Sequence, residues 1–130
     1  MATKSMEFYF SKFTLSKSDI KAVKKKLINS ANLEKLAACL TLVGNSTRLK
    51  IILLINELKE LCVNDISKFL DISVSAVSQH LSKLKAHGLV KSRKRSQTVF
   101  YSLSDHSFLN TLVEKFLERF KKNFKKYFNQ

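Results

Sequence analysis

The stretch from residue 63 to residue 103 limits the possible folds most, because four structural patterns follow one another in it. A short helical pattern comes first, and its residues predicted to face inward are Ile66, Phe69 and Leu70. A tight link at 71–73 leads into a second helical pattern, which ends at Gly88. Two runs rich in β-formers then flank a polar turn near 95–97 and predict a β-hairpin. We therefore expect a mainly α-helical fold with a small β-hairpin.

The second helical pattern combines an apolar stripe with an unusual polar side. The stripe predicted to face the core consists of Val74, Val77, Leu81 and Leu84. The other side carries short hydrogen-bonding groups and one lysine, at Ser75, Ser78, Gln79, Ser82 and Lys83. An exposed helix face normally carries Glu–Lys pairs, whereas no acidic residue occurs between Asp71 and Asp105. These polar side chains are therefore candidates for contact with an anionic partner.

The acid-free window also collects positive charge. Its cations are Lys83, Lys85, Lys91, Arg93, Lys94 and Arg95. A short helix, a link, a second helix and a basic hairpin occur in the order of a winged helix-turn-helix. Serine and glutamine near the start of the second helix can bond to base edges in the major groove, while hairpin cations can lie along phosphates or enter the minor groove. The alternative is that both surfaces are merely solvated.

Composition agrees with an anionic partner. The 130 residues contain 24 Lys plus Arg against 10 Asp plus Glu, giving a formal charge of +14, which points to nucleic acid or an anionic membrane, although compositional bias explains part of it. Two cysteines, Cys39 and Cys62, suit a reducing compartment. No signal-peptide run is found, and the longest apolar stretch, 51–55, is too short to cross a bilayer. The sequence therefore predicts a cytoplasmic protein.

The flanking segments are predicted to be helical. We expect an N-terminal arm at 1–17 and one domain at 18–130, beginning with a helix capped by Ser18, broken near 29–32 and stopped by Gly44. The next helix follows "NST" and is predicted to bury Leu49, Ile52, Leu53, Ile55 and Leu58. The last helix is predicted to follow a cap at Ser104. Its large apolar residues recur every four positions at Phe108, Leu112, Phe116, Phe120, Phe124 and Phe128.

The stretch from Leu42 to Leu103 resembles the ArsR/SmtB family of bacterial winged helix-turn-helix repressors. The most specific matches are "GNSTRLKIILLI", "SVSAVSQHLSKL" and "GLVKSRKRSQTVFYSL", and the last resembles the HlyU/BigR branch. The resemblance implies a homodimeric repressor that binds an operator inverted repeat in double-stranded DNA and is released by an effector. It matches Ser73, Ser75, Ser78, Gln79 and His80 to the recognition helix, and residues 93–97, with Gln97, to the wing. Arg48 fits the family's "TRL" signature, and we interpret it as structural.

The same resemblance predicts no metal and no cofactor. Metal-sensing members carry two cysteines where this chain has Cys62 and Asn64, so the thiolate pair is incomplete. At a second family site Asp105 matches, whereas Ser107, Glu118 and Lys121 replace the other ligands, and a lysine repels a cation. A helix cap at Asp105 is the better interpretation. Redox sensing by Cys39 and Cys62 stays open, because a link requires α-carbons within about 7 Å.

Two other functions compete with DNA binding. The last helix, with lysines opposite its phenylalanines, is also typical of a membrane-surface or partner-binding helix. A dimer seam is the simpler interpretation, with an interface predicted at Phe108, Leu112, Phe116 and Phe120. An enzyme has no support, because no nucleophile motif or phosphate-binding glycine loop is present.

Overall fold

The computed structural model describes residues 14–128, apart from the side chains of residue 107 and residues 123–128. The contacts divide the chain into two compact units, 1–38 and 39–130, and each is described by itself. The predicted division into an arm at 1–17 and a domain at 18–130 stays a prediction. Most of that arm lies outside the described residues.

The first unit consists of consecutive helices. Helix α2 (Lys17–Val23) runs into the π-helical turn η1 (Lys24–Ile28), and α3 (Ala31–Val43) follows and extends into the second unit. The break predicted near 29–32 is confirmed, because residues 29 and 30 separate η1 from α3. The predicted cap was wrong: Ser16, not Ser18, accepts a hydrogen bond from the Asp19 backbone N–H. Two serines compete for this position, and Ser16 alone has the extended backbone of a cap.

In the second unit, three helices begin and end at the predicted signals. Helix α4 (Ser46–Leu58) is capped by the Asn45 side chain, and α6 (Val74–Ala86) by the Ser73 side chain. Between them lies α5 (Val63–Leu70). Gly44 follows the end of α3, and Gly88 has a positive φ of 73° just after α6, which glycine adopts without strain. Both glycines therefore stop helices, as predicted.

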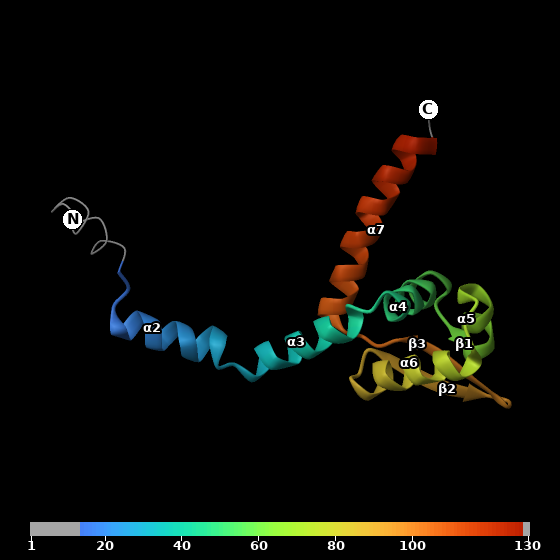
Figure 1. Cartoon of the computed structure of the whole chain (residues 1–130), viewed down its shortest axis with the longest axis horizontal. Coiled ribbons are helices and arrows are strands. Elements are labelled where there is room, and N and C mark those ends of the chain that lie inside the picture. Colours follow the sequence, from blue (N-terminus) through green and yellow to red (C-terminus); the bar gives the residue numbers. More distant parts are fainter. Residues whose placement is uncertain (1–13, 129–130) are drawn as a thin grey trace. The chain divides into compact units, whose positions relative to one another are not determined.

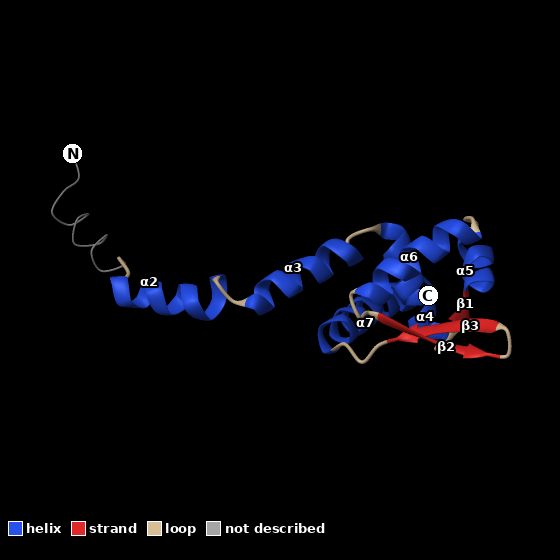
Figure 2. Ribbon diagram, turned by 90° about the horizontal axis from the view of Figure 1, so that it is seen from below, coloured by secondary structure: helices blue, strands red, loops and turns tan. Residues whose placement is uncertain are grey.

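A three-stranded antiparallel sheet accompanies these helices, in the order β1-β3-β2. The predicted hairpin is confirmed as β2 (Val90–Arg95) and β3 (Thr98–Leu103), with its turn at residues 96 and 97 (Figure 2). Strand β1 (Leu61–Cys62) was not predicted, because two residues between helices carry no recognisable strand pattern. It pairs with the middle of β3, so the hairpin is attached to the end of α4.

The core of the second unit confirms most of the predicted apolar residues and corrects three. Its fully buried members include Ile51, Ile52, Ile55, Ile66, Val77, Leu81, Leu84 and Leu89. Leu58, Phe69 and Val74 were predicted to face inward, but all three are exposed. Each lies at an end of its helix, where a residue with helical spacing passes beyond the neighbouring elements. Ile51 was not predicted and is fully buried.

Helix α7 (Ser107–Phe128) begins later than predicted and is capped differently. The Leu109 backbone N–H donates to Nδ1 of His106 at 3.3 Å, so the helix is capped by His106 and neither by Ser104 nor by Asp105. In Figure 1, α7 follows β3 at the end of the hairpin opposite the turn. No single helix within residues 14–128 is long and apolar enough to cross a membrane; only the bent pair of α3 and α4, taken together, meets that test of length and composition.

Candidate nucleic-acid interface

The helix-turn-helix is formed by α5, a short link and α6 (Figure 1). Asp71 takes a left-handed conformation at φ 54°, which ends α5 and turns the chain. The Ser67 hydroxyl donates to the Ile72 carbonyl, and the Ile72 N–H donates back to the Ser67 carbonyl. These two hydrogen bonds hold the link after α5 against Ser67. The entry angle of α6 is therefore set by local hydrogen bonds as well as by core packing.

Helix α6 presents to solvent the polar side that the sequence predicted. Ser75, Gln79 and Lys83 are exposed, while Ser78 is half-buried. The opposite side is anchored, because Val77, Leu81 and Leu84 are fully buried. Ser73 caps the helix, since its hydroxyl accepts the Ala76 N–H at 3.1 Å, and its contact with DNA stays a prediction. Loss of such a cap costs about 1 kcal/mol of stability.

His80 is half-buried and faces Arg48 rather than standing free on α6. Arg48 Nε donates to the Leu42 carbonyl at 2.6 Å, and Nη1 lies 3.5 Å from Nδ1 of His80. Burial, with the charges of Arg48 and Lys83, lowers the pKa of His80 and favours the neutral ring. The structural interpretation of Arg48 is confirmed, because it links the end of α3 to α6. His80 therefore faces Arg48 within the chain, and its predicted contact with DNA stays a prediction.

The hairpin carries the predicted cations, but Arg93 is already paired. Its Nε and Nη2 donate to the two carboxylate oxygens of Glu60, at 2.8 and 3.0 Å. This bidentate contact lowers the pKa of Glu60 and raises that of Arg93. No sequence pattern indicated this pair, because Glu60 lies 33 residues before Arg93 and outside the acid-free window. Glu60 directly precedes β1 and Arg93 lies in β2, so the pair connects the two outer strands on either side of β3.

The other hairpin cations differ in their surroundings. The Arg95 guanidinium lies over the Phe100 ring, 4.4 Å from its centre, and keeps its charge exposed. Lys85 donates to the Ser92 hydroxyl at 2.7 Å and so connects α6 to β2. Lys94 is exposed, and within residues 14–128 it forms no ion pair. Gln97 is exposed in the turn. The wing therefore presents Lys94, Arg95 and Gln97 to solvent.

The two cysteines lie in different surroundings, and both are free thiols. Cys39 is buried, which raises the pKa of its thiol and keeps it protonated. Cys62 is half-buried, and its thiol donates to Asp65 at 3.2 Å. Redox sensing by this pair stays an untested prediction. In the described part of the chain, no three His, Cys, Asp or Glu residues gather as a metal-binding group.

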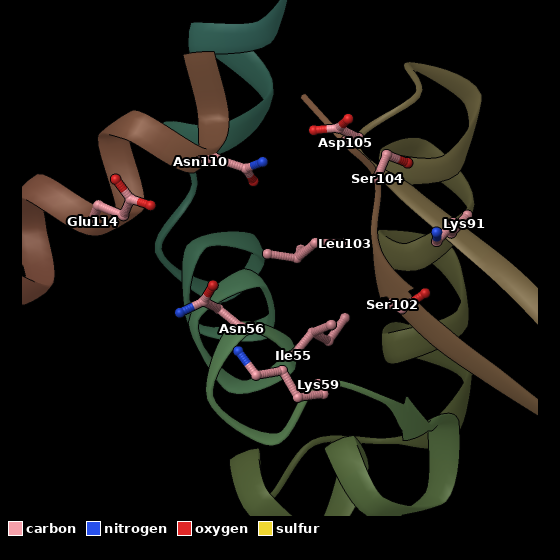
Figure 3. A pocket seen from close by; sticks show the side chains of 10 residues that line it. All are labelled: Ile55, Asn56, Lys59, Lys91, Ser102, Leu103, Ser104, Asp105, Asn110 and Glu114. Atoms are coloured by element: carbon pink, nitrogen blue, oxygen red, sulfur yellow. The ribbon is translucent and has the colours of Figure 1, made fainter. Parts of the chain in front are cut away.

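A hollow of about 450 Å³ lies at the base of the wing, away from its turn (Figure 3). Its walls come from the end of α4, from β2 and β3, and from the start of α7. They are lined by Ile55, Asn56, Lys59, Lys91, Ser102, Leu103, Ser104, Asp105, Asn110 and Glu114. Two lysines and two carboxylates balance its charge. None of the predicted DNA-binding residues lines it, so the hollow lies apart from the candidate interface on α6 and the wing.

Comparison with known proteins agrees with this geometry. Residues 45–92 match the model of the family described as "Bacterial regulatory protein, arsR family". The chain is 44% identical over 73 residues to the transcriptional activator HlyU of Vibrio cholerae serotype O1, covering 56% of this chain and 67% of the relative. It is 45% identical over 65 residues to the arsenical resistance operon repressor of Escherichia coli, covering 50% and 56%.

Two further matches extend the likeness beyond that segment. The CadC homolog of Staphylococcus aureus, a cadmium resistance transcriptional regulatory protein, is 35% identical over 91 residues, covering 70% of this chain and 74% of the relative. The solved structure of HlyU from V. cholerae N16961 has a TM-score of 0.61 at 34% identity and covers 78% of this chain and 99% of that one. This protein is therefore a DNA-binding transcriptional regulator of the winged helix-turn-helix fold and belongs to the ArsR family of bacterial regulatory proteins.

Proposed function

We propose that the chain is a homodimeric repressor that reads an operator inverted repeat with α6 and contacts its phosphates with the β2–β3 wing. The observation that carries this proposal is the exposed side of α6, which offers Ser75 and Gln79 on a helix whose other side is fully buried. Hydroxyl and amide groups both donate and accept hydrogen bonds, as base edges in the major groove require. A firmly packed helix holds them in position.

Repression is favoured over activation because it needs DNA binding alone. A bound dimer blocks access to a promoter, whereas activation also needs a surface that recruits the transcription machinery. Repression and activation both occur among the relatives, since the E. coli protein is named a repressor and HlyU an activator. An effector of unknown identity would release the DNA. We propose no enzymatic activity and no metal.

A dimer is supported by the apolar surface of α7. Leu112, Phe116 and Phe120 are exposed, and the two phenylalanine rings stack with centres 6.3 Å apart. A second copy of the chain would cover this stripe, and a two-fold arrangement would match an inverted repeat. Phe108, predicted at the same seam, is half-buried against the chain's own core and contributes less to the interface.

Substitution of the two exposed polar residues on α6 tests the proposal. Ser75→Ala and Gln79→Ala should each weaken operator binding by roughly 1 to 3 kcal/mol, because each removes hydrogen bonds to base edges. Binding to unrelated duplexes should hardly change, since it depends on phosphates. The measurement is a titration with labelled operator, selected from the DNA that flanks the gene, and with a random duplex.

Ser82→Ala is the matched control, because Ser82 is exposed on α6 almost two turns beyond Ser75 and farther from the leading end. The Ser82→Ala variant should bind operator and random DNA as tightly as the wild type does. Ser73 is unsuitable, since its substitution also removes the helix cap. Equal losses on operator and random DNA would show that α6 does not read sequence, and failure of the wild type to bind any duplex would overturn the proposed function.

A further inference from the structure

Five lysines crowd the helical segment formed by α2 and η1, far from the winged helix-turn-helix in sequence. They are Lys17, Lys21, Lys24, Lys25 and Lys26, and all are exposed. No acidic residue occurs between Asp19 and Glu34. Asp19 itself is engaged by Ser16, whose hydroxyl donates to its carboxylate at 2.7 Å. This second acid-free window resembles the one that contains α6 and the wing.

Four of these lysines share one face. Lys17, Lys21, Lys24 and Lys25 line a single shallow hollow of about 510 Å³ together with Ile20 and Asn29. The four are called the lysine face below. The π-helical turn contributes to it, because the Asn29 N–H donates to the Lys24 carbonyl five residues earlier, at 2.7 Å. π-Helical turns are rare and occur frequently at functional sites.

The lysine face is costly to a free protein. Like charges four residues apart, as at Lys17–Lys21 and Lys21–Lys25, destabilise a helix. Within residues 14–128, no lysine of this face forms an ion pair with a carboxylate. The repulsion is therefore not relieved inside the described chain. An anionic partner would relieve it.

Two other apolar residues of these helices lie outside the hollow. Val23 and Leu27 are exposed on a stripe about 100° around the helix from Lys17, Lys21 and Lys24, whereas Ile20 lies between the two stripes and lines the hollow with the lysines. A partner can thus cover the apolar stripe while the lysine face stays free. A membrane surface would engage the apolar residues and the lysines together, so binding to vesicles distinguishes it from binding to DNA.

We propose that the lysine face is a second DNA-contacting surface, which binds phosphates of the operator duplex without reading bases. The inference rests on the proposed function, because α6 and the wing bring the duplex to the chain and raise its local concentration at these lysines. Ammonium groups on flexible stems suit phosphate contact, which positions a protein but carries no sequence information. The face therefore strengthens binding to operator and random DNA alike.

The test is a quadruple variant, Lys17→Gln, Lys21→Gln, Lys24→Gln and Lys25→Gln, in the full chain. Binding to operator and to random duplex is titrated at several salt concentrations. The slope of log affinity against log salt should fall by about 0.9 for each lysine that contacts a phosphate, and so by up to about 3.6 units per protomer. The ratio of operator to random affinity should stay the same. Replacing the same four lysines by arginine should preserve the slope, since the charges remain.

The control removes four other exposed lysines, Lys50, Lys115, Lys121 and Lys122, by the same change to glutamine. It should lower the slope by less than one unit. A lysine-face variant that keeps the wild-type slope, or loses no more than the control, overturns the inference while leaving the proposed function intact. Loss of binding to phosphatidylglycerol vesicles with an unchanged DNA slope would also overturn it, in favour of a membrane surface. Circular dichroism confirms that each variant is folded.

Discussion

At the scale of single residues, Glu60 controls what one cation of the wing can do. Arg93 lies where a wing residue would meet phosphate, yet both carboxylate oxygens of Glu60 hold its guanidinium. Such a bidentate contact uses donors that a phosphate would otherwise accept. Glu60 therefore keeps one positive charge of the wing neutralised and connects β2 to the end of α4.

Glu60→Gln should strengthen binding to random DNA and steepen the salt dependence. Without the carboxylate, Arg93 is free to contact one more phosphate, so the slope of log affinity against log salt should steepen by about 0.9 per protomer. The measurement is the same salt titration on random duplex. Weaker binding with an unchanged slope would contradict this and show that the pair chiefly positions the wing.

The matched control is Glu57→Gln. Glu57 is exposed on α4, one turn before Glu60, and in the described part of the chain no hydrogen bond or ion pair involves its side chain. The change in net charge is identical. Only the loss of the Arg93 contact differs, so the control should leave the slope nearly unchanged.

At the scale of elements, the wing should anchor DNA and α6 should read it. Lys94 and Arg95 are exposed next to the turn, and Arg95 is held over Phe100. Cations that contact phosphate release counterions whatever the base sequence. The hairpin and the helix therefore contribute to different quantities, namely overall affinity and the preference for operator.

The double variant Lys94→Ala and Arg95→Ala should weaken operator and random DNA by similar factors. The salt slope should fall by about one to two units per protomer, since up to two phosphate contacts are lost per wing. Lys115→Ala with Lys122→Ala removes the same charge from α7 and should have little effect. An unchanged slope in the wing variant would mean that the wing points away from DNA.

At the scale of the whole molecule, α7 divides its apolar residues between two neighbours. Leu109 and Val113 are buried in the chain's own core, and Leu117 packs against it. The adjacent stripe of Leu112, Phe116 and Phe120 is exposed. One helix thus completes a domain and presents a surface for a second copy.

Phe116→Asp with Phe120→Asp should give monomers, because carboxylates in an apolar seam lose hydration without gaining a partner. Operator affinity should fall sharply, since a dimer places its two recognition helices about 34 Å apart to reach two half-sites. Sedimentation velocity measures the assembly. Phe69→Asp is the control, because Phe69 is exposed on α5 outside the proposed seam, and it should stay dimeric. A dimeric double variant would show that the seam is misplaced.

The sequence by itself determined the features that depend on neighbours within about one helical turn. Helical spacing predicted α4, α5, α6 and their order, the "NST" segment predicted a cap for α4, and two glycines mark helix ends. The hairpin turn followed from a polar break between two β-forming runs. Each signal acts through local backbone hydrogen bonds or one face of one helix, so its range is short.

Tertiary structure alone decided which residues meet across the chain. The pairing of Arg93 with Glu60, the bridge from Arg48 to His80, and the addition of β1 to β3 join positions separated by about thirty residues or more. Packing also decided which of several apolar residues on one helix are buried. Leu109 and Val113, which lie beside the every-fourth stripe predicted for the dimer seam, are the residues of α7 that enter the chain's own core. Periodicity shows which residues share one face of a helix, but only the neighbouring elements determine which face is buried.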